Sequence, residues 1–223
     1  MRCLVSCYAY IMTTDKDPAR RLGELLWVLN AQYFIVQAIV AASWSKVGYS
    51  WAGNTISDLG NTHCGPYGTR LVCSPMHAVM NISFITLGMT IIGGAALLQK
   101  SLASGFVARL GFWCMAAAGA GAILVGLFPE NSVSSLHITG AALSFLLGNL
   151  GMILLGVNFS WLPKILRSYT VLSGLVGLVA LVLFLTHAYA GIDIGGMERV
   201  AAYPQTIWMI IFGVYLFLQP IIS

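Results

Sequence analysis

Hydrophobic residues along this chain gather into six long runs that short polar segments separate. The runs are Leu25–Ser45, His77–Leu98, Phe106–Leu127, Leu136–Asn158, Tyr169–Ala188 and Ala202–Ile222. Each is close in length to the roughly 20 apolar residues that a helix needs to cross the ~30 Å hydrocarbon core of a bilayer. The runs are also about twice as long as a barrel strand and lack its alternation of polar and apolar positions. The pattern therefore predicts an all-α, polytopic membrane protein in which residues 25–223 form a six-transmembrane-helix bundle.

The composition is typical of a chain that lies in lipid rather than in water. Of the 223 residues, 58% are hydrophobic and 8% are charged, and the mean hydropathy is +0.85. An ordinary soluble domain has about 25% charged residues. So few charges cannot cover a water-facing surface, which argues against a soluble enzyme, a disordered chain and a nucleic-acid binder. The net charge of +4 needs no anionic partner, because membrane proteins carry basic loops on one side.

Lysine and arginine are divided unequally between the two sides of the predicted bundle. Cytoplasmic loops of membrane proteins are enriched in these residues. The richer side carries Arg2, Lys16, Arg20, Arg21, Lys100, Arg109, Lys164 and Arg167, and the poorer side carries Lys46, Arg70 and Arg199. We therefore expect an N-in/C-in orientation, with residues 1–24 as a cytoplasmic segment. This segment starts at Met1 or, because MTTDKDPARR makes a normal cytoplasmic beginning, at Met12.

The other ionisable residues gather on the outer side of the predicted bundle. They comprise four of the seven acids and all four histidines, namely Asp58, Glu130, Asp193, Glu198, His63, His77, His137 and His187. Solubility alone would not put histidines at the ends of three helices, and ionisable groups near hydrocarbon are costly. We therefore expect an outward-facing polar site at these helix ends. The structural alternative is that each histidine bonds a backbone carbonyl.

Three of the histidines, His77, His137 and His187, are predicted to lie at a similar depth. Zinc takes His and carboxylate ligands and, in catalytic sites, keeps an open position for an activated water. The three rings, with Asp58 or Glu130 as a further ligand or as general base, thus suggest a metal-dependent hydrolase. A haem held between His137 and His187 is another alternative, because haem needs ligands on opposed helices at matching depth.

The first outer loop, residues 46–76, contributes three more candidate residues. Ser57 stands beside Asp58 and is the candidate nucleophile of an enzyme, while its structural alternative is a cap or turn residue. Cys64 and Cys73 enclose the bendable segment GPYGTRLV, and in an oxidising outer compartment we expect them to form a disulfide. A metal-binding cysteine pair usually has a shorter spacing.

The third outer loop, residues 191–200, contains the adjacent pair Glu198 and Arg199. One interpretation is that this pair binds a lipid headgroup. The other is that it locks the loop to Asp58 through a structural salt bridge.

Several of these residues together carry a family resemblance. The motif Asn54-x-x-Ser57-Asp58-Leu59-Gly60 precedes Asn81, and it is followed by Gly126-x-Phe128-Pro129-Glu130 with His137 and by Glu198-Arg199 ahead of Trp208. The combination resembles the DUF998 family of bacterial and archaeal multi-pass membrane proteins over nearly the whole chain. The resemblance implies a six-helix bundle in a prokaryotic cell membrane. Its shared polar residues include our ligand-binding candidates, namely Asn54, Asn81, Glu198 and Arg199.

The leading functional hypothesis is a membrane-embedded protein whose outward pocket binds a lipid or another amphiphile. Asp58, Glu130, His137 and Arg199 would contact the polar head, and the helices would hold the tail. The alternatives are the metal-dependent hydrolase acting on a lipid-like substrate, with Ser57, Asp58 and Glu130 as catalytic residues, and the haem-binding electron-transfer protein. A retinal Schiff base is excluded, because no predicted span contains a lysine.

Overall fold

The computed structural model describes residues 17–45 and 48–219, so the candidate start residues Met1 and Met12 lie outside the described part. The helices are α2 (Pro18–Val28), α3 (Ala31–Ala42), α4 (His77–Leu102), α5 (Gly105–Leu127), α6 (Ser134–Ala142), α7 (Gly148–Asn158), α8 (Lys164–Leu185) and α9 (Asp193–Leu218). A 3-10 turn η2 (Ser57–Gly60), a π-helical segment η3 (Leu143–Leu147) and the strands β1 (Cys64–Tyr67) and β2 (Arg70–Cys73) complete the described chain.

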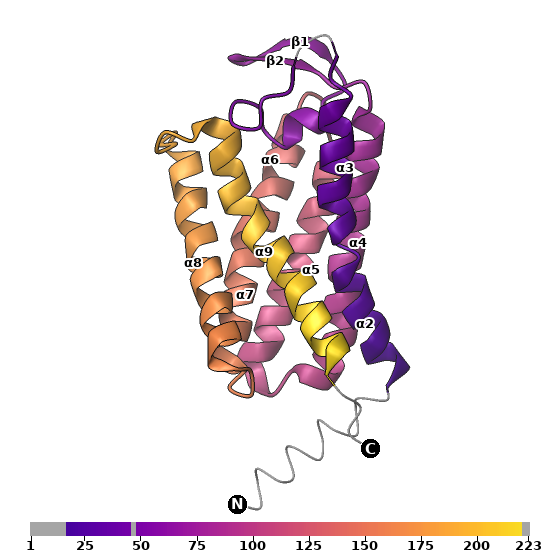
Figure 1. The fold of residues 1–223 in the computed structure, drawn as a ribbon, viewed down its shortest axis with the longest axis vertical. Coiled ribbons are helices and arrows are strands. Elements are labelled where there is room, and N and C mark those ends of the chain that lie inside the picture. The colour runs from indigo at the N-terminus through magenta and orange to yellow at the C-terminus, as the bar shows by residue number, and fades with distance from the viewer. Residues whose placement is uncertain (1–16, 46–47, 220–223) are drawn as a thin grey trace, which may run out of the picture.

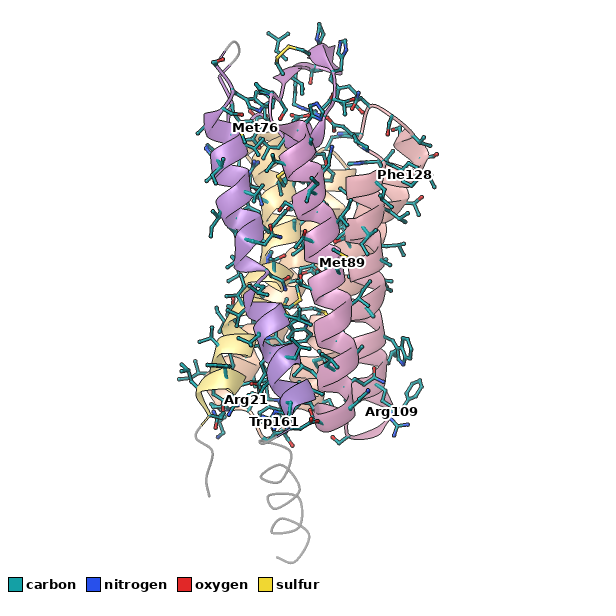
Figure 2. All side chains as sticks on the ribbon, turned by 90° about the vertical axis from the view of Figure 1, so that its right-hand side faces the viewer. Arg21, Met76, Met89, Arg109, Phe128 and Trp161 are labelled. Atoms are coloured by element: carbon teal, nitrogen blue, oxygen red, sulfur yellow. A yellow bond between two sulfur atoms is a disulfide. The ribbon has the colours of Figure 1, made fainter. Side chains whose placement is uncertain are left out.

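These elements form a bundle of six membrane-length helical units, which confirms the predicted fold class (Figure 1). The units within the described ranges are Pro18–Ala42, His77–Leu102, Gly105–Leu127, Ser134–Asn158, Lys164–Leu185 and Asp193–Leu218. Figure 2 shows Arg21, Arg109 and Trp161 at one end of the bundle, Met76 and Phe128 at the other, and Met89 between them. Large apolar side chains such as Phe106, Ile165 and Leu172 are exposed on the outside of the helices, as expected for a surface in contact with lipid.

The first and last helical units begin much earlier than the hydrophobic pattern predicts. The first begins at Pro18, because Asp17 caps it by accepting a hydrogen bond from the Ala19 amide (2.9 Å) and proline suits the first helical position. The charges that this brings into the bundle are paired, since Arg20 Nε lies 3.0 Å from Glu24 Oε1. The last unit begins at Asp193 rather than Ala202, so Glu198 and Arg199 lie inside a helix and not in a loop.

Small residues let α5 pack closely in the middle of the bundle, against α4 on one side and α6, η3 and α7 on the other. A Cβ atom on Gly88 of α4 would meet the backbone oxygen of Gly119 on α5. Likewise, Gly121 of α5 faces the backbone of Gly140 and Ser144. Close backbone approach at small residues is the usual basis of helix packing in membranes, where burial from water contributes little.

A short β-hairpin covers the end of the bundle opposite to the two ends of the described chain (Figure 1). Its antiparallel strands pair Cys64 with Cys73 and Tyr67 with Arg70. Gly68, with φ of +58°, opens the two-residue turn, where a left-handed backbone favours glycine. The sulfur atoms of Cys64 and Cys73 are bonded in the structure. The hairpin thus forms a closed loop whose turn end carries Arg70.

Candidate functional site

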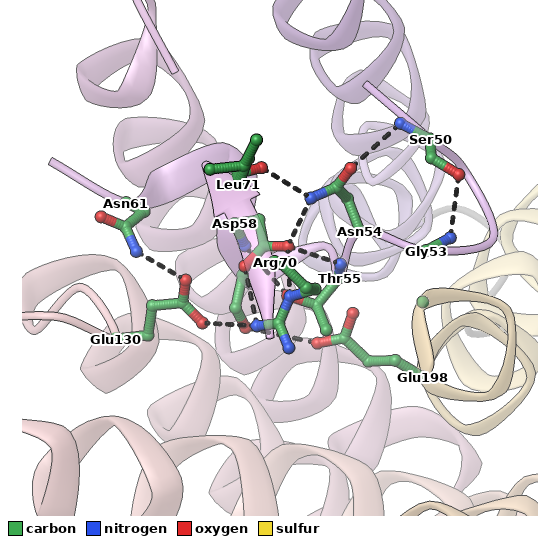
Figure 3. Close-up of polar contacts among 12 residues, drawn as sticks. Ser50, Gly53, Asn54, Thr55, Asp58, Asn61, Arg70, Leu71, Glu130 and Glu198 are labelled. Atoms are coloured by element: carbon green, nitrogen blue, oxygen red, sulfur yellow. Dashed lines mark hydrogen bonds and ion pairs between the residues drawn. The ribbon is translucent and has the colours of Figure 1, made fainter. Parts of the chain in front are cut away.

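Polar side chains gather at the hairpin end of the bundle, where the loop between α3 and α4 meets the α5–α6 region and α9 (Figure 3). The loop before η2 and η2 itself supply Asn54, Ser57 and Asp58. The hairpin supplies Arg70, and the connection between α5 and α6 supplies Glu130. The top of α9 adds Glu198 and Arg199, and α6 adds His137. Most of these side chains are buried, so their partners decide which charges the site can hold.

Asp58 is fully buried and ion-paired with Arg70. The Arg70 guanidinium donates to both carboxylate oxygens, from Nε to Oδ2 at 2.8 Å and from Nη2 to Oδ1 at 2.9 Å. The Thr55 amide and the Asn54 side chain donate to Oδ2 as well, at 2.9 and 3.0 Å. Burial raises the pKa of Asp58, but the hydrogen bonds and charge of Arg70, together with the hydrogen bonds of Glu130 and Asn54, outweigh burial and hold this pKa below its ordinary value. Asp58 is therefore ionised at neutral pH.

Glu130 is the second acid beside the same arginine. Its Oε2 lies 3.9 Å from Arg70 Nη2, and its Oε1 accepts a hydrogen bond from the Asn61 side chain at 2.8 Å. Burial and the neighbouring Asp58 carboxylate raise the pKa of Glu130 to about 9, because one arginine does not neutralise two acids. The cluster of Asp58, Arg70 and Glu130 therefore keeps a proton on Glu130 and is electrically neutral at pH 7.

Glu198 projects from α9 into the outer loop and is 3% exposed. One of its carboxylate oxygens accepts a hydrogen bond from the Ile56 amide, and the other lies 3.3 Å from the Ser57 hydroxyl. On its other side Ser57 Oγ lies 3.0 Å from His137 Nε2. The second ring nitrogen of His137 lies 2.8 Å from the Phe128 carbonyl oxygen. Ser57 therefore connects α9 to α6.

The Arg199 side chain holds the outer loop by donating to backbone carbonyl oxygens of that loop. Its Nη1 donates to the carbonyl oxygens of Trp51, Asn54 and Gly195 at 2.8, 2.9 and 2.7 Å, and its Nη2 donates to the Tyr49 hydroxyl. The guanidinium also lies over the Tyr49 and Trp51 rings, 5.6 and 5.0 Å from their centroids. Its Nε is buried and has no hydrogen-bond partner among the described residues. Arg199 therefore ties the outer loop to the first turns of α9.

The pair Glu198 and Arg199 locks the loop in a different way from the predicted one. The predicted salt bridge to Asp58 is replaced by backbone contacts, at Ile56 for the acid and at Trp51 and Asn54 for the base. Asp58 takes Arg70 instead. The hairpin brings this arginine within reach, whereas Nη1 and Nη2 of Arg199 already donate to backbone carbonyl oxygens and to the Tyr49 hydroxyl.

Asn54 and Asn81 organise backbone around the site rather than projecting into open space. Asn54 accepts from the Ser50 amide at 3.1 Å and donates to Asp58. Asn81, on α4, donates to the Gly60 carbonyl oxygen at 2.9 Å, and its own Oδ1 has no partner among the described residues. Both residues therefore fix the course of the chain around η2. Their role as ligand-binding residues stays a prediction.

The three histidines do not converge on a metal site. His137 has both ring nitrogens engaged, whereas the exposed His187 contacts the Tyr189 hydroxyl at 2.7 Å. His77 opens α4, and its buried Nδ1 has no partner among the described residues. Within residues 17–45 and 48–219, no group of three or more His, Cys, Asp or Glu is arranged to hold a metal ion. In the described structure these rings contact different neighbours, and the roles of His77, His137 and His187 as zinc ligands, and of His137 and His187 as haem ligands, stay predictions.

Residues of α9 border two hollows within the described part of the chain. The larger is a groove of about 440 Å³ between α8 and α9, lined by Tyr169, Leu172, Ser173, Val176, Arg199, Val200, Tyr203, Pro204 and Ile207. Pro204 interrupts the hydrogen bonding of α9, and prolines bend helices at such points. The smaller is a cavity of about 30 Å³ inside the bundle, bordered by Tyr33, Ser57, Ser144, Glu198 and apolar side chains. A volume of that size holds a water molecule but no lipid.

Sequence reasoning did not identify Arg70, Asn61 or Tyr49 as parts of the site. Arg70 drew attention only as an outer positive charge, although a cation between two cysteines and close to Asp58 is a signal for pairing. Asn61 and Tyr49 carry no motif, and their contacts with Glu130 and Arg199 join residues far apart in sequence. The nucleophile role of Ser57 stays a prediction, and its hydroxyl is engaged on two sides.

Comparison with known proteins identifies a family. A family model described as a protein of unknown function, DUF998, matches residues 30–215. The match covers the chain from the break between α2 and α3 to the last turns of α9, and it includes the polar residues of the site. Neither the curated proteins nor the solved structures contain a match to this chain.

Proposed function

This chain belongs to the DUF998 family of multi-pass membrane proteins, and we propose that it binds an amphiphile with an acidic head group. The apolar tail lies in the groove between α8 and α9, and the head group meets Arg199. The observation that carries the proposal is Arg199, which lines a groove that is otherwise mainly apolar and whose buried Nε has no partner among the described residues. A buried donor without a partner is costly, and an anionic oxygen supplies the missing acceptor.

The size and lining of the groove support this assignment. Its volume of about 440 Å³ lies within the range of about 300–1,000 Å³ that is typical of small-molecule sites. Leu172, Val176 and Ile207 offer apolar contacts for a chain, while Ser173 and Tyr203 add polar atoms. Because Pro204 has no N–H, the Val200 carbonyl in the same groove also lacks its helical donor.

The proposal assigns fewer residues to the head group than the sequence predicts. Asp58 already bonds Arg70, and Glu130 already bonds Asn61. His137 already contacts Ser57 and the Phe128 carbonyl oxygen. Of the four predicted head-group residues, Arg199 alone lines the groove. The ligand therefore carries a carboxylate or a phosphate rather than a cation.

Binding of radiolabelled palmitate, hexadecyl phosphate and hexadecanol to the purified protein in nanodiscs tests the proposal. Ser173→Phe fills the groove without touching Arg199. Leu175→Phe is its matched control, because Leu175 is exposed on the same helix and does not line the groove. We expect saturable binding of at least one anionic probe, about tenfold weaker binding of hexadecanol, and loss of binding in Ser173→Phe alone. Equal binding by both variants, or indifference to head-group charge, contradicts the proposal.

We also propose that the hairpin end faces the outside of a prokaryotic cell membrane and that both chain ends are cytoplasmic. Two features support this orientation. Lys100, Arg109, Lys164 and Arg167 lie at the helix ends opposite to the hairpin, which suits the cytoplasmic side. The bonded Cys64 and Cys73 suit an oxidising compartment.

A further inference from the structure

A chain of hydrogen bonds crosses from α9 to α6 through the outer loop. Glu198 Oε1 lies 3.3 Å from Ser57 Oγ, and Ser57 Oγ lies 3.0 Å from His137 Nε2. Each end of the chain is anchored by backbone, since the Ile56 amide donates to Glu198 and the Phe128 carbonyl oxygen contacts His137 Nδ1 at 2.8 Å. Glu198 and His137 are both buried. The positions of these donors and acceptors therefore decide how many hydrogens the three side chains share.

The backbone contact sets the state of one ring nitrogen. A carbonyl oxygen only accepts, so His137 Nδ1 carries a hydrogen and donates it to Phe128. Nε2, which faces Ser57, is then either a bare acceptor or the second N–H of an imidazolium. The Ser57 hydroxyl has one hydrogen and lies between two groups that both accept when they are unprotonated. The Ser57 hydroxyl can donate its hydrogen to one of these two groups, and the other group must then donate a hydrogen to Ser57.

Two arrangements satisfy every contact, and each contains one extra proton. In the first, Glu198 is a carboxylic acid that donates to Ser57, and Ser57 donates to the neutral His137 ring. In the second, Ser57 donates to the Glu198 carboxylate, and the protonated Nε2 of His137 donates to Ser57. Moving the acid proton to Ser57 while the Ser57 proton moves to Nε2 converts the first into the second, with no atom or charge gained or lost.

We propose that Glu198, Ser57 and His137 form a buried proton relay that binds a single exchangeable proton and passes it between α9 and α6. Removing this proton leaves an unpaired acceptor in a buried site, which is costly. None of the three relay residues lines the amphiphile groove, although Arg199, which does line it, acts on Glu198 through its charge.

The residues around the relay place charges of opposite sign near Glu198. The charged or titratable groups that act on Glu198 include Arg199 and Tyr203 on α9, Tyr33 on α3, Tyr49 in the outer loop, Asp58 on η2 and Arg70 on β2. Asp58 is itself paired with Arg70, which also contacts Glu130. The attraction from Arg199 and the repulsion from Asp58 partly offset each other.

The cavity of about 30 Å³ borders two members of the relay, Ser57 and Glu198, and also Ser144. It has room for a water molecule with several polar partners, and such a water accepts or supplies the proton. Ser144 belongs to η3, the π-helical segment of the fourth helical unit. Segments of this kind are frequent at functional sites because they redirect side chains and free backbone groups.

Nuclear magnetic resonance of the protein with ¹⁵N-histidine and carboxyl-¹³C-glutamate, in nanodiscs, tests the relay. His137→Gln and Glu198→Gln assign the two signals. Because interacting groups titrate as one pair, we expect the His137 Nε2 and Glu198 carboxyl signals to change over the same pH interval. Ser57→Ala should separate the two titrations, and Ser57→Thr, which keeps the hydroxyl, should preserve their coincidence. Glu130→Gln is the matched acid control and should leave both signals unchanged, because Glu130 contacts Asn61 and Arg70 instead.

Two outcomes would overturn the relay. One is a His137 signal that titrates independently of Glu198 in the unmodified protein. The other is coincident titration that persists in Ser57→Ala, which would assign the coupling to direct electrostatics. If Ser57→Ala does not fold, the comparison of the unmodified protein with Ser57→Thr and Glu198→Gln still decides the matter, because a glutamine side chain cannot carry the shared proton.

Discussion

At the scale of single residues, burial determines the charge state of the hairpin end. Asp58, Arg70 and Glu130 exclude water from one another, so each charge is stabilised by its neighbours and not by solvent. Breaking such a pair is costly because it leaves the remaining charge buried without compensation. The neutral cluster accordingly depends on Arg70, a residue that belongs to the hairpin and to no helix.

Replacing Arg70 by alanine should strongly destabilise the protein. The Asp58 carboxylate is fully buried and would lose its only cation within ion-pair distance among the described residues. We expect the free energy of unfolding to fall by about 3–5 kcal/mol, measured by denaturant unfolding in a mild detergent. Arg109→Ala, at the opposite end and exposed, is the control and should change stability by less than about 0.5 kcal/mol. An equal effect of the two substitutions would contradict the role given to Arg70.

The raised pKa of Glu130 predicts a stability that falls with increasing pH. The folded protein holds a proton on Glu130 up to a pKa of about 9, whereas the ordinary value is 4.5. Between these two pH values the folded state binds more protons than the unfolded state, so stability declines by up to about 1.4 kcal/mol per pH unit. Asp58, whose pKa is lowered, has the opposite effect: its contribution to stability is lost as the pH falls into the acidic range.

Glu130→Gln should flatten this pH dependence, because glutamine keeps the hydrogen bond with Asn61 but cannot ionise. Unfolding midpoints measured from pH 5 to pH 9 in the two proteins provide the test. The variant should gain stability relative to the unmodified protein as the pH rises. Parallel curves would show that Glu130 does not carry the proton.

At the scale of elements, glycine positions decide how closely the helices approach. Gly88 on α4 and Gly119 on α5 each face the other's backbone oxygen, so the two backbones lie close together at this point. Further along α4, Gly93 faces the end of the Leu26 side chain on α2. Backbone cannot move aside without moving a whole helix, whereas the tip of a leucine can rotate.

Gly88→Ala and Gly93→Ala should therefore differ, although both are made on the same helix. The first forces α4 and α5 apart and should cost about 1–3 kcal/mol, as overpacking commonly does. The second should be close to neutral, because the Leu26 side chain can adjust and alanine favours the helix. Thermal unfolding of both variants in the same detergent gives the comparison. Equal destabilisation would mean that the α4–α5 contact is not the tighter one.

At the scale of the whole molecule, the bundle has two chemically different ends. The hairpin end contains the cluster of Asp58, Arg70 and Glu130, the proton relay and the end of the α8–α9 groove that Arg199 lines. The opposite end has an aromatic core in which the Trp208 and Phe212 rings stack with centroids 4.9 Å apart, and its connections are short. This polarity agrees with a protein that takes its ligand at one face of the membrane.

Cysteine labelling in intact cells tests the orientation of the two ends. Ser132→Cys lies in the exposed connection between α5 and α6, and Ser104→Cys lies in the exposed connection between α4 and α5. A membrane-impermeant maleimide should label the first variant in whole cells and the second only after lysis, with the parent protein as background. Labelling of Ser104→Cys in whole cells would reverse the proposed orientation.

The sequence by itself determined the number of helical units, their membrane setting and the end at which the ionisable residues gather. These properties are local, because the length and polarity of a run decide whether a helix can cross a bilayer. The family followed from the motifs around Asp58, Glu130 and Glu198, which are also local. The helix starts at Pro18 and Asp193 were missed, since buried partners compensate for polar residues that a hydrophobic pattern excludes.

Only the tertiary structure decided which polar groups meet. It pairs Asp58 with Arg70 instead of Arg199, joins His137 to Glu198 through Ser57, and gives His187 the Tyr189 hydroxyl as its neighbour. These outcomes depend on the rotation of each helix about its axis and on how the outer loop folds back over the bundle. Neither is encoded in a single run of sequence, because both result from packing between segments that lie far apart along the chain.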